Sequence, residues 1–186
     1  MKRIGVFIDG SNLYKSAQSL GIRIDFTKLK KYYQGLGDVA QAAYFTALPP
    51  KDVPSTLRPL ADFVEFNGFT LIQKETKEYY DSNTHERKLK GNMDVEIATY
   101  IKEVAHTLDD IVLYSGDGDF RYLIESVQRT GCHVTVVSTR ALVADALRRQ
   151  ANEFVDLATL KDKFLHESRE TPPAVVKKRF GFIEGK

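Results

Sequence analysis

The sequence contains one cysteine, no long hydrophobic run and little net charge. A lone Cys132 cannot form an intrachain disulfide or a thiolate zinc cluster, which is typical of proteins from a reducing cytoplasm. No apolar stretch approaches the roughly 20 residues of a membrane-spanning helix. The opening residues, Met1-Lys2-Arg3, lead directly into a strand pattern instead of a signal-peptide core. We therefore expect a cytoplasmic protein without membrane contact.

The formal net charge of +2 is too small to indicate nucleic-acid binding by itself, so any such function must rest on local patches. With 42% hydrophobic residues among 186, the chain has enough apolar material for the core of one ordinary domain. We expect that domain at residues 1–166. The remaining 167–186 contain Pro172-Pro173 and a basic cluster, and we interpret them as a tail that is either flexible or docks on a partner.

Strand and helix patterns alternate along the predicted domain. Strands are predicted at 4–8, 39–46, 69–73, 111–114, 133–138 and 154–155, and helices at 13–20, 26–33, 53–66, 92–108, 120–129, 142–149 and 157–165. Strands separated by helices predict an α/β fold with a mostly parallel sheet, right-handed crossovers and helices on both faces. Segment 74–90 has no clear period and predicts a mobile loop or an exposed hairpin. Within 53–66, Pro54 suits a first helical turn, whereas Pro59 predicts a kink or a restart.

Acidic residues stand where two of the predicted strands end. Asp9 follows the first strand, and Asp117 and Asp119 follow the fourth, within the sequence SGDGDF. Ligands of open α/β sheets bind at the carboxyl ends of the strands, near the point where strand order reverses. The first and fourth strands commonly flank that point, so we expect these acids to meet. Asp94 opens the strongest helix on the same stripe as Ile97, and therefore faces the sheet.

Each acid also has a purely structural interpretation. Asp9 suits a turn, Asp117 and Asp119 suit helix caps, and Asp94 suits a first helical turn where the macrodipole favours a negative charge. A cluster of acids that nearby bases cannot neutralise is better explained by a divalent cation. Mg²⁺ and Mn²⁺ prefer oxygen ligands, and we expect one of them to be held by Asp9, Asp94, Asp117 and Asp119.

Other residues near this edge are candidates for contact with a substrate. Asn12 is predicted to bind a phosphate or the water of a metal ion, or else to cap a helix. Ser115 is predicted to contact substrate or orient an acid or a water, unless it is simply a satisfied strand-end hydroxyl. Candidates for phosphate contact and base stacking are Lys15, Lys88, Lys90, Arg121, Arg148, Arg149, Tyr79 and Tyr80. The four histidines fall outside these motifs.

Three motifs in this order resemble those of the NYN domain, the nuclease branch of the PIN-like superfamily. They are FIDGSNL at 7–13, KGNMDVEIA at 90–98 and SGDGDF at 115–120. The resemblance covers residues 2–163 and is specific as a triplet. It extends to the bacterial LabA-like branch of that family. It implies a three-layer, PIN-like Rossmannoid fold and a metal-dependent ribonuclease. The catalytic and metal-site acids would be Asp9, Asp94, Asp117 and Asp119, with Asn12 beside them.

We therefore expect a ribonuclease that uses Mg²⁺ or Mn²⁺ to hydrolyse RNA phosphodiester bonds. A non-catalytic RNA-binding or regulatory module on the same fold stays open as an alternative. DNA as a substrate, a homo-oligomer and a protein partner for the tail also stay open. An aspartyl-nucleophile phosphatase, resembling the haloacid dehalogenase superfamily, ranks lower because Ser11 stands where that mechanism needs a second Asp.

Overall fold

The computed structural model describes residues 1–81 and 86–167, without the side chains of 78–90 and 165–167. The strands are β1 (Arg3–Asp9), β2 (Ile22–Ile24), β3 (Asp38–Leu48), β4 (Thr70–Glu75), β5 (Lys77–Asp81), β6 (Glu86–Lys90), β7 (Asp110–Tyr114), β8 (His133–Ser138), β9 (Glu153–Asp156) and β10 (Leu165–Glu167). The α-helices are α1 (Gly10–Leu20), α2 (Phe26–Gln34), α3 (Arg58–Phe66), α4 (Asp94–Val104), α5 (Arg121–Gln128), α6 (Asp145–Gln150) and α7 (Lys161–Phe164). Short 3-10 turns are η1 (Ala105–Thr107), η2 (Gly118–Phe120) and η3 (Leu157–Leu160).

Six strands form one parallel sheet in the order β4-β3-β1-β7-β8-β9. Along the chain, the first of these strands lies beside both the second and the fourth. This is the doubly wound arrangement, in which strand order reverses between β1 and β7. The predicted α/β class with a parallel sheet and helices on both faces is therefore confirmed.

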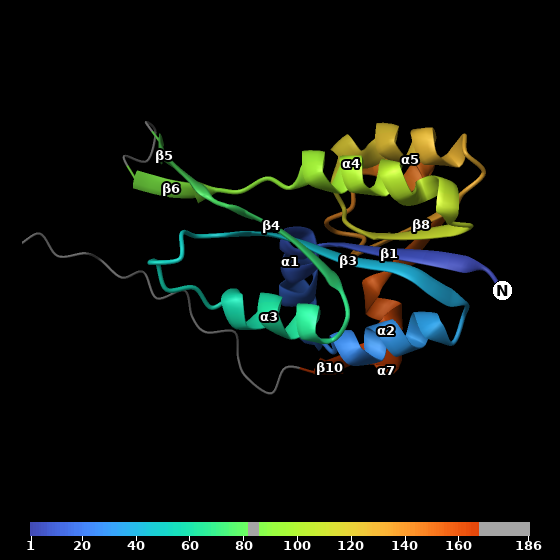
Figure 1. The fold of residues 1–186 in the computed structure, drawn as a ribbon, viewed down its shortest axis with the longest axis horizontal. Coiled ribbons are helices and arrows are strands. Elements are labelled where there is room, and N and C mark those ends of the chain that lie inside the picture. The colour runs from blue at the N-terminus through green and yellow to red at the C-terminus, as the bar shows by residue number, and fades with distance from the viewer. Residues whose placement is uncertain (82–85, 168–186) are drawn as a thin grey trace, which may run out of the picture.

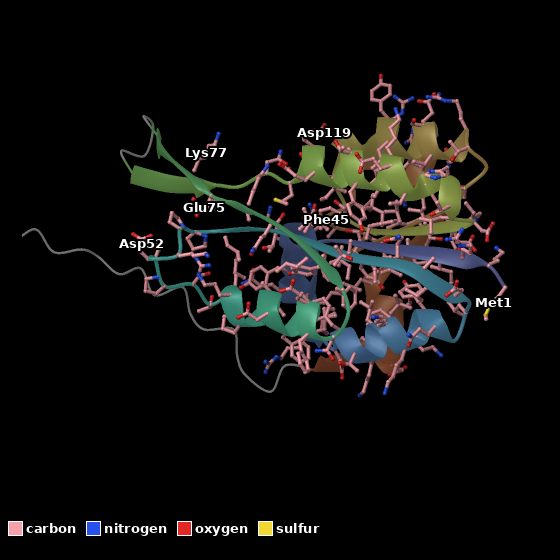
Figure 2. All side chains as sticks on the ribbon, in the orientation of Figure 1. Met1, Phe45, Asp52, Glu75, Lys77 and Asp119 are labelled. Carbon is pink, nitrogen blue, oxygen red and sulfur yellow. The ribbon has the colours of Figure 1, made fainter. Side chains whose placement is uncertain are left out.

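Helices cover both faces of this sheet and make a three-layer domain (Figure 1). Helices α4 and α5 lie over one face, and α1, α2, α3 and α7 lie over the other. Strand β1 is buried from its second residue to its last, which explains its unbroken apolar run instead of an alternating pattern. Phe45 lies in the middle of the sheet between the two helical layers and is fully buried (Figure 2).

Three predicted α-helices begin at least three residues later in the structure than their sequence patterns suggest. Helix α7 begins at Lys161 instead of residue 157, because residues 157–160 form η3. Helix α3 begins at Arg58 instead of residue 53, and Pro59 lies in its first turn. Proline has no backbone N–H, but an N–H in the first turn would have no intrahelical partner, so α3 begins here without losing a hydrogen bond. Helix α6 begins at Asp145 instead of residue 142. The preceding residues form a turn in which the N–H groups of Leu142 and Val143 donate to the carbonyl of Thr139.

Segment 74–90 was predicted to be either a mobile loop or an exposed hairpin, and the structure contains a hairpin there. Strand β4 continues to Glu75, and β5 and β6 then pair antiparallel as an arm that projects from the body (Figure 1). A second small sheet, β2 with β10, was not predicted because each strand has only three residues. Among the described residues, no helix has the length and apolar character needed to cross a membrane.

Candidate metal centre

Asp9 ends β1 and caps α1, and its side chain is 3% exposed. One carboxylate oxygen, Oδ1, accepts from the backbone N–H of Ser11 (3.1 Å), the hydroxyl of Ser11 (3.0 Å) and the backbone N–H of Asn12 (3.2 Å). The other, Oδ2, accepts from the side-chain amide of Asn12 and from the hydroxyl of Ser115 (3.2 Å). These donors are all uncharged, so they satisfy the buried carboxylate while leaving its negative charge uncancelled.

Ser115 and Asn12 connect the turn after β1 to the turn after β7. The Ser115 hydroxyl donates to Asp9 and accepts from the backbone N–H of Asp117 at 3.2 Å. The Asn12 carbonyl oxygen, Oδ1, accepts from the backbone N–H of Gly116 at 3.4 Å. Both links cross the point where strand order reverses. Because Ser115 is buried, its contacts favour the predicted orienting role over direct contact with substrate.

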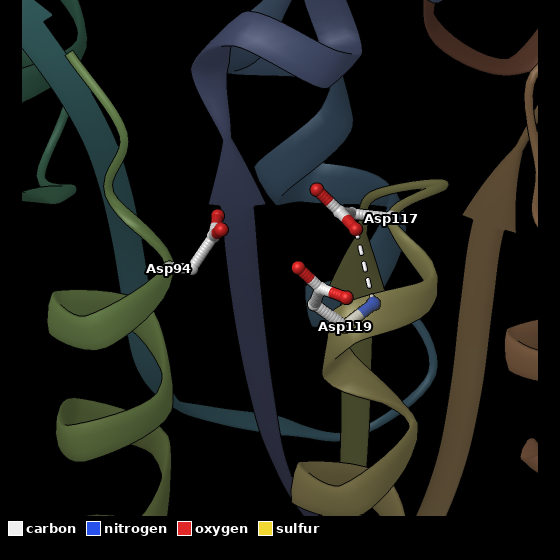
Figure 3. Close-up of side chains that lie close together, drawn as sticks. All are labelled: Asp94, Asp117 and Asp119. Atoms are coloured by element: carbon white, nitrogen blue, oxygen red, sulfur yellow. Dashed lines mark hydrogen bonds between the residues drawn. The ribbon is translucent and has the colours of Figure 1, made fainter.

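Asp117 and Asp119 are held in a tight turn after β7. Asp117 caps η2, and its Oδ1 accepts from the backbone N–H of Asp119 at 3.0 Å (Figure 3). Gly116 allows this turn to pack closely, since a Cβ there would lie 2.5 Å from the carbonyl oxygen of Leu142 and 2.9 Å from Oγ of Ser138. The glycine is therefore required by packing.

Asp94 is the first residue of α4 and approaches from the helical layer above the sheet. The Asn92 side chain donates to one carboxylate oxygen of Asp94 at 2.6 Å and accepts from its backbone N–H at 2.7 Å. These two bonds orient the Asp94 carboxylate. Burial raises its pKa, the Asn92 hydrogen bond opposes the shift, and the charges of Asp117, Asp9 and Asp119 reinforce it.

The carboxylates of Asp94, Asp117 and Asp119 face one another in Figure 3. One oxygen from each lies within 4.8 Å of the others. Within the described part of the chain, neither these three acids nor Asp9 forms an ion pair. Uncompensated carboxylates at this spacing fit a hard divalent cation such as Mg²⁺ or Mn²⁺.

The structure therefore brings together three of the four predicted acids. Asp9 lies outside this group of three, although its charge acts on Asp94. Its capping bonds agree with the structural alternative predicted for it, and Asp117 also acts as a cap. Capping uses Oδ1 of Asp117 and leaves its second oxygen without a bond to a described residue, so capping does not exclude a ligand role.

The predicted substrate contacts lie on several elements. Lys15 is exposed on α1, Arg121 opens α5, and Arg148 on α6 pairs with Asp145 at 3.5 Å. The side chains of Tyr79, Tyr80, Lys88 and Lys90 lie outside the described residues. Backbone pairing in the hairpin places Tyr79 opposite Lys88 and Lys77 opposite Lys90.

Sequence reasoning missed two features near the acids. Ser138 and Thr139, at the end of β8, are buried with hydroxyls that have no hydrogen-bond partner in the described structure. Tyr122 and Lys102 line a groove between α4 and α5. The signal for Tyr122 was available, because an aromatic residue just before the buried Leu123 and Ile124 falls off the apolar stripe of that helix.

Comparison with known proteins agrees with these motifs. The family model of the NYN domain matches residues 3–158. The chain is 31% identical over 176 residues to the low amplitude and bright protein LabA of Synechococcus elongatus, covering 93% of this chain and 92% of LabA. A crystal structure of a protein of unknown function from Vibrio parahaemolyticus superposes with a TM-score of 0.72 at 25% identity, covering 89% of this chain and 96% of that one. The chain therefore belongs to the NYN domain family, within the PIN-like nuclease superfamily.

Proposed function

We propose that this protein is a Mg²⁺- or Mn²⁺-dependent ribonuclease that hydrolyses RNA phosphodiester bonds at the Asp94, Asp117 and Asp119 carboxylates. The observation that carries the proposal is the convergence of these oxygens within 4.8 Å of one another, with no described cation paired to them. Two family properties support it, because PIN-like nucleases generally use divalent metals and NYN domains generally bind RNA.

The residues divide into ligands and positioning groups. Asp94, Asp117 and Asp119 would hold the ion. A divalent ion bound there would activate water, neutralise the scissile phosphate and stabilise the leaving oxygen. Asp9 adds a buried negative charge next to these ligands. Its hydrogen bonds with Ser115 and Asn12 also connect the turn that carries Asp117 to the start of α1. Asp9 and Asn12 are therefore positioning residues in this proposal.

The same geometry disfavours an aspartyl-phosphate mechanism. The only acid at the end of β1 is Asp9, which is buried and accepts five hydrogen bonds. A carboxylate has about four lone-pair positions, so all of its acceptor capacity is used. Ser11, at the position where a second acid would be needed, donates its hydroxyl to Asp9.

A cleavage assay tests the proposal directly. The substrates are single-stranded and structured RNA and the matching DNA, incubated with protein in Mn²⁺, Mg²⁺ or excess EDTA. We expect wild-type cleavage of RNA in either metal, none in EDTA, and a loss of at least about 100-fold in Asp117→Asn, the scale at which ligand-supporting groups of metal sites already act. The matched control is Asp162→Asn, an exposed acid on α7, which should cleave normally.

Three results would each contradict a different part of the ribonuclease proposal. Full activity in EDTA would exclude the metal role. RNA binding without cleavage under every metal condition would instead support the non-catalytic, regulatory alternative. Cleavage of DNA in preference to RNA would keep the site chemistry and change the substrate class.

A further inference from the structure

A groove between α4 and α5 opens directly from the candidate metal centre. It has a volume of about 420 Å³, and its lining includes Asp94, Val95, Ala98, Lys102, Asp119 and Tyr122. Two of these residues, Asp94 and Asp119, also belong to the carboxylate cluster. A substrate bound at the carboxylates would therefore also lie beside this groove.

The groove presents apolar surface to solvent. The side chains of Val95 and Tyr122 are 73% and 72% exposed, and Ala98 and Leu123 contribute further apolar lining. The guanidinium of Arg121 lies 5.2 Å from the centroid of the Tyr122 ring. A cation at that distance is attracted to the ring face and restrains the ring. The groove therefore combines an aromatic surface with aliphatic side chains, and the positive charge of Arg121 lies beside the aromatic ring.

Lys102 lies farther along the groove. It is eight residues after Asp94 on α4, which corresponds to about 12 Å along the helix axis. Its side chain is exposed and forms no ion pair within the described part of the chain. An unpaired ammonium at this place suits a second phosphate on a strand whose first phosphate is at the carboxylate cluster.

We infer that this groove binds an unpaired nucleobase of the RNA substrate, stacked on Tyr122 beside the scissile phosphate, with a neighbouring phosphate on Lys102. The inference rests on the proposed function for the position of the scissile phosphate. Bases in a duplex have both faces stacked and cannot enter an aromatic pocket, whereas single-stranded bases can. The groove therefore makes the protein a reader of single-stranded RNA.

Binding measurements test the inference separately from catalysis. A fluorescein-labelled single-stranded oligoribonucleotide and a blunt RNA duplex of the same sequence are titrated, with anisotropy as the readout. Millimolar Ca²⁺ replaces Mg²⁺, because it is another hard cation that takes oxygen ligands. The variants are Tyr122→Ala, Tyr122→Phe and Lys102→Ala. Matched controls are Phe66→Ala on α3 and Lys31→Ala on α2, both exposed in the opposite helical layer.

We expect Tyr122→Ala to weaken single-strand binding about tenfold, the scale of one lost base–aromatic stack, while Tyr122→Phe stays near wild type. Lys102→Ala should weaken binding and lower the salt slope by about one, the value for one lost phosphate contact. Duplex affinity should be unchanged in Tyr122→Ala, and both controls should match wild type. Because the readout is affinity, this test gives a result even if the protein does not cleave RNA, so failure of the inference can be told apart from failure of the proposed activity.

Three outcomes would overturn the inference. The first is unchanged single-strand affinity in both Tyr122→Ala and Lys102→Ala. The second is an equal loss for duplex and single strand in Tyr122→Ala, which would indicate a general surface effect. The third is no single-strand binding by the wild type.

Discussion

At the scale of single residues, the four aspartates predicted to share one site have different environments. Asp9 is buried and saturated by neutral hydrogen-bond donors, whereas Asp94 and Asp117 are half-buried and Asp119 is exposed. The burial of Asp9 places a negative charge behind the other three and contributes to the raised pKa of Asp94. The fold thus maintains mutual repulsion among carboxylates, an arrangement that a bound cation would relieve.

Asp94→Asn should make the metal-free protein more stable at pH 7. An unfolded Asp titrates near pH 3.9. The raised pKa in the fold means that stability is lost as pH rises through the folded value, and this loss is present at pH 7. The loss of wild-type stability should therefore shrink as the pH is lowered toward the unfolded pKa near 3.9, and this pH dependence should be absent in Asp94→Asn. Urea unfolding in EDTA at several pH values measures both effects.

Mn²⁺ should raise the melting temperature of the wild type. At 100 times its dissociation constant, a ligand stabilises the fold by about 2.7 kcal/mol. For a domain of this size, that corresponds to roughly 5–10 °C. Asp94→Asn should lose most of this shift and Asp162→Asn should keep it, as thermal melts with and without Mn²⁺ will show. A shift of equal size in wild type and Asp94→Asn would remove Asp94 from the metal centre.

At the scale of elements, one buried hydrogen bond joins α2 to the centre of the sheet. The Tyr33 and Tyr114 hydroxyls are 2.9 Å apart, and their rings pack edge to face with centroids 6.4 Å apart. Burial is the main cause that raises the pKa of both tyrosines, and burial together with Asp9 raises the pKa of Tyr44 to about 12. In the folded protein these phenols therefore stay protonated at pH values at which the same tyrosines would ionise in the unfolded chain.

Tyr33→Phe should destabilise the protein by about 1–3 kcal/mol, because it leaves the buried Tyr114 hydroxyl without its partner. The double variant Tyr33→Phe/Tyr114→Phe should recover part of that loss, since no polar group is then stranded. A double-mutant cycle by urea unfolding measures the coupling, and additive single effects would contradict it.

The same pair makes stability fall at alkaline pH. Unfolded tyrosines ionise near pH 10, whereas the folded ones stay protonated, so wild-type stability should decline above about pH 10. The double Phe variant should decline less steeply over the same interval. Equal slopes would show that these two phenols do not cause the decline.

At the scale of the whole molecule, the doubly wound strand order determines where the candidate site forms. Asp9 ends β1, and Asp117 follows the adjacent parallel strand β7. Helix α4 lies over the sheet so that its first residue, Asp94, reaches the same edge. The sheet, both hydrophobic layers and the acids all lie before residue 168. The division into a domain at 1–166 and a tail at 167–186 stays a prediction.

Deleting residues 168–186 should leave the domain folded. We expect a change below about 0.5 kcal/mol, or less than ~2 °C in melting temperature, with any loss seen in affinity or partner choice. A longer deletion from residue 165 also removes β10, which pairs with β2, and should lower the melting temperature. Circular dichroism melts compare the two truncations. An equal drop in both would show that the tail packs on the domain.

Much of this molecule follows from local sequence patterns. The continuous apolar run of β1 and the helical period after residue 93 predicted the parallel sheet with its covering helices. The resemblance of three motifs indicated the NYN family. The acids at two strand ends and at the start of α4 predicted a cluster of four, of which three meet. Such patterns are readable because burial on a strand or helix leaves a period in the sequence. Mg²⁺ or Mn²⁺, RNA as substrate and a cytoplasmic location stay predictions.

Only the tertiary structure separated Asp9 from the cluster and opened the groove beside Tyr122. The sequence pattern indicates that Asp9 caps α1 beside Ser11 and Asn12. It does not show that Ser115 also donates to Asp9, because that contact crosses between the turns after β1 and β7. The groove likewise depends on how far apart α4 and α5 pack over the sheet. Local propensity determined the elements, and the close packing of distant segments decided which side chains face the site.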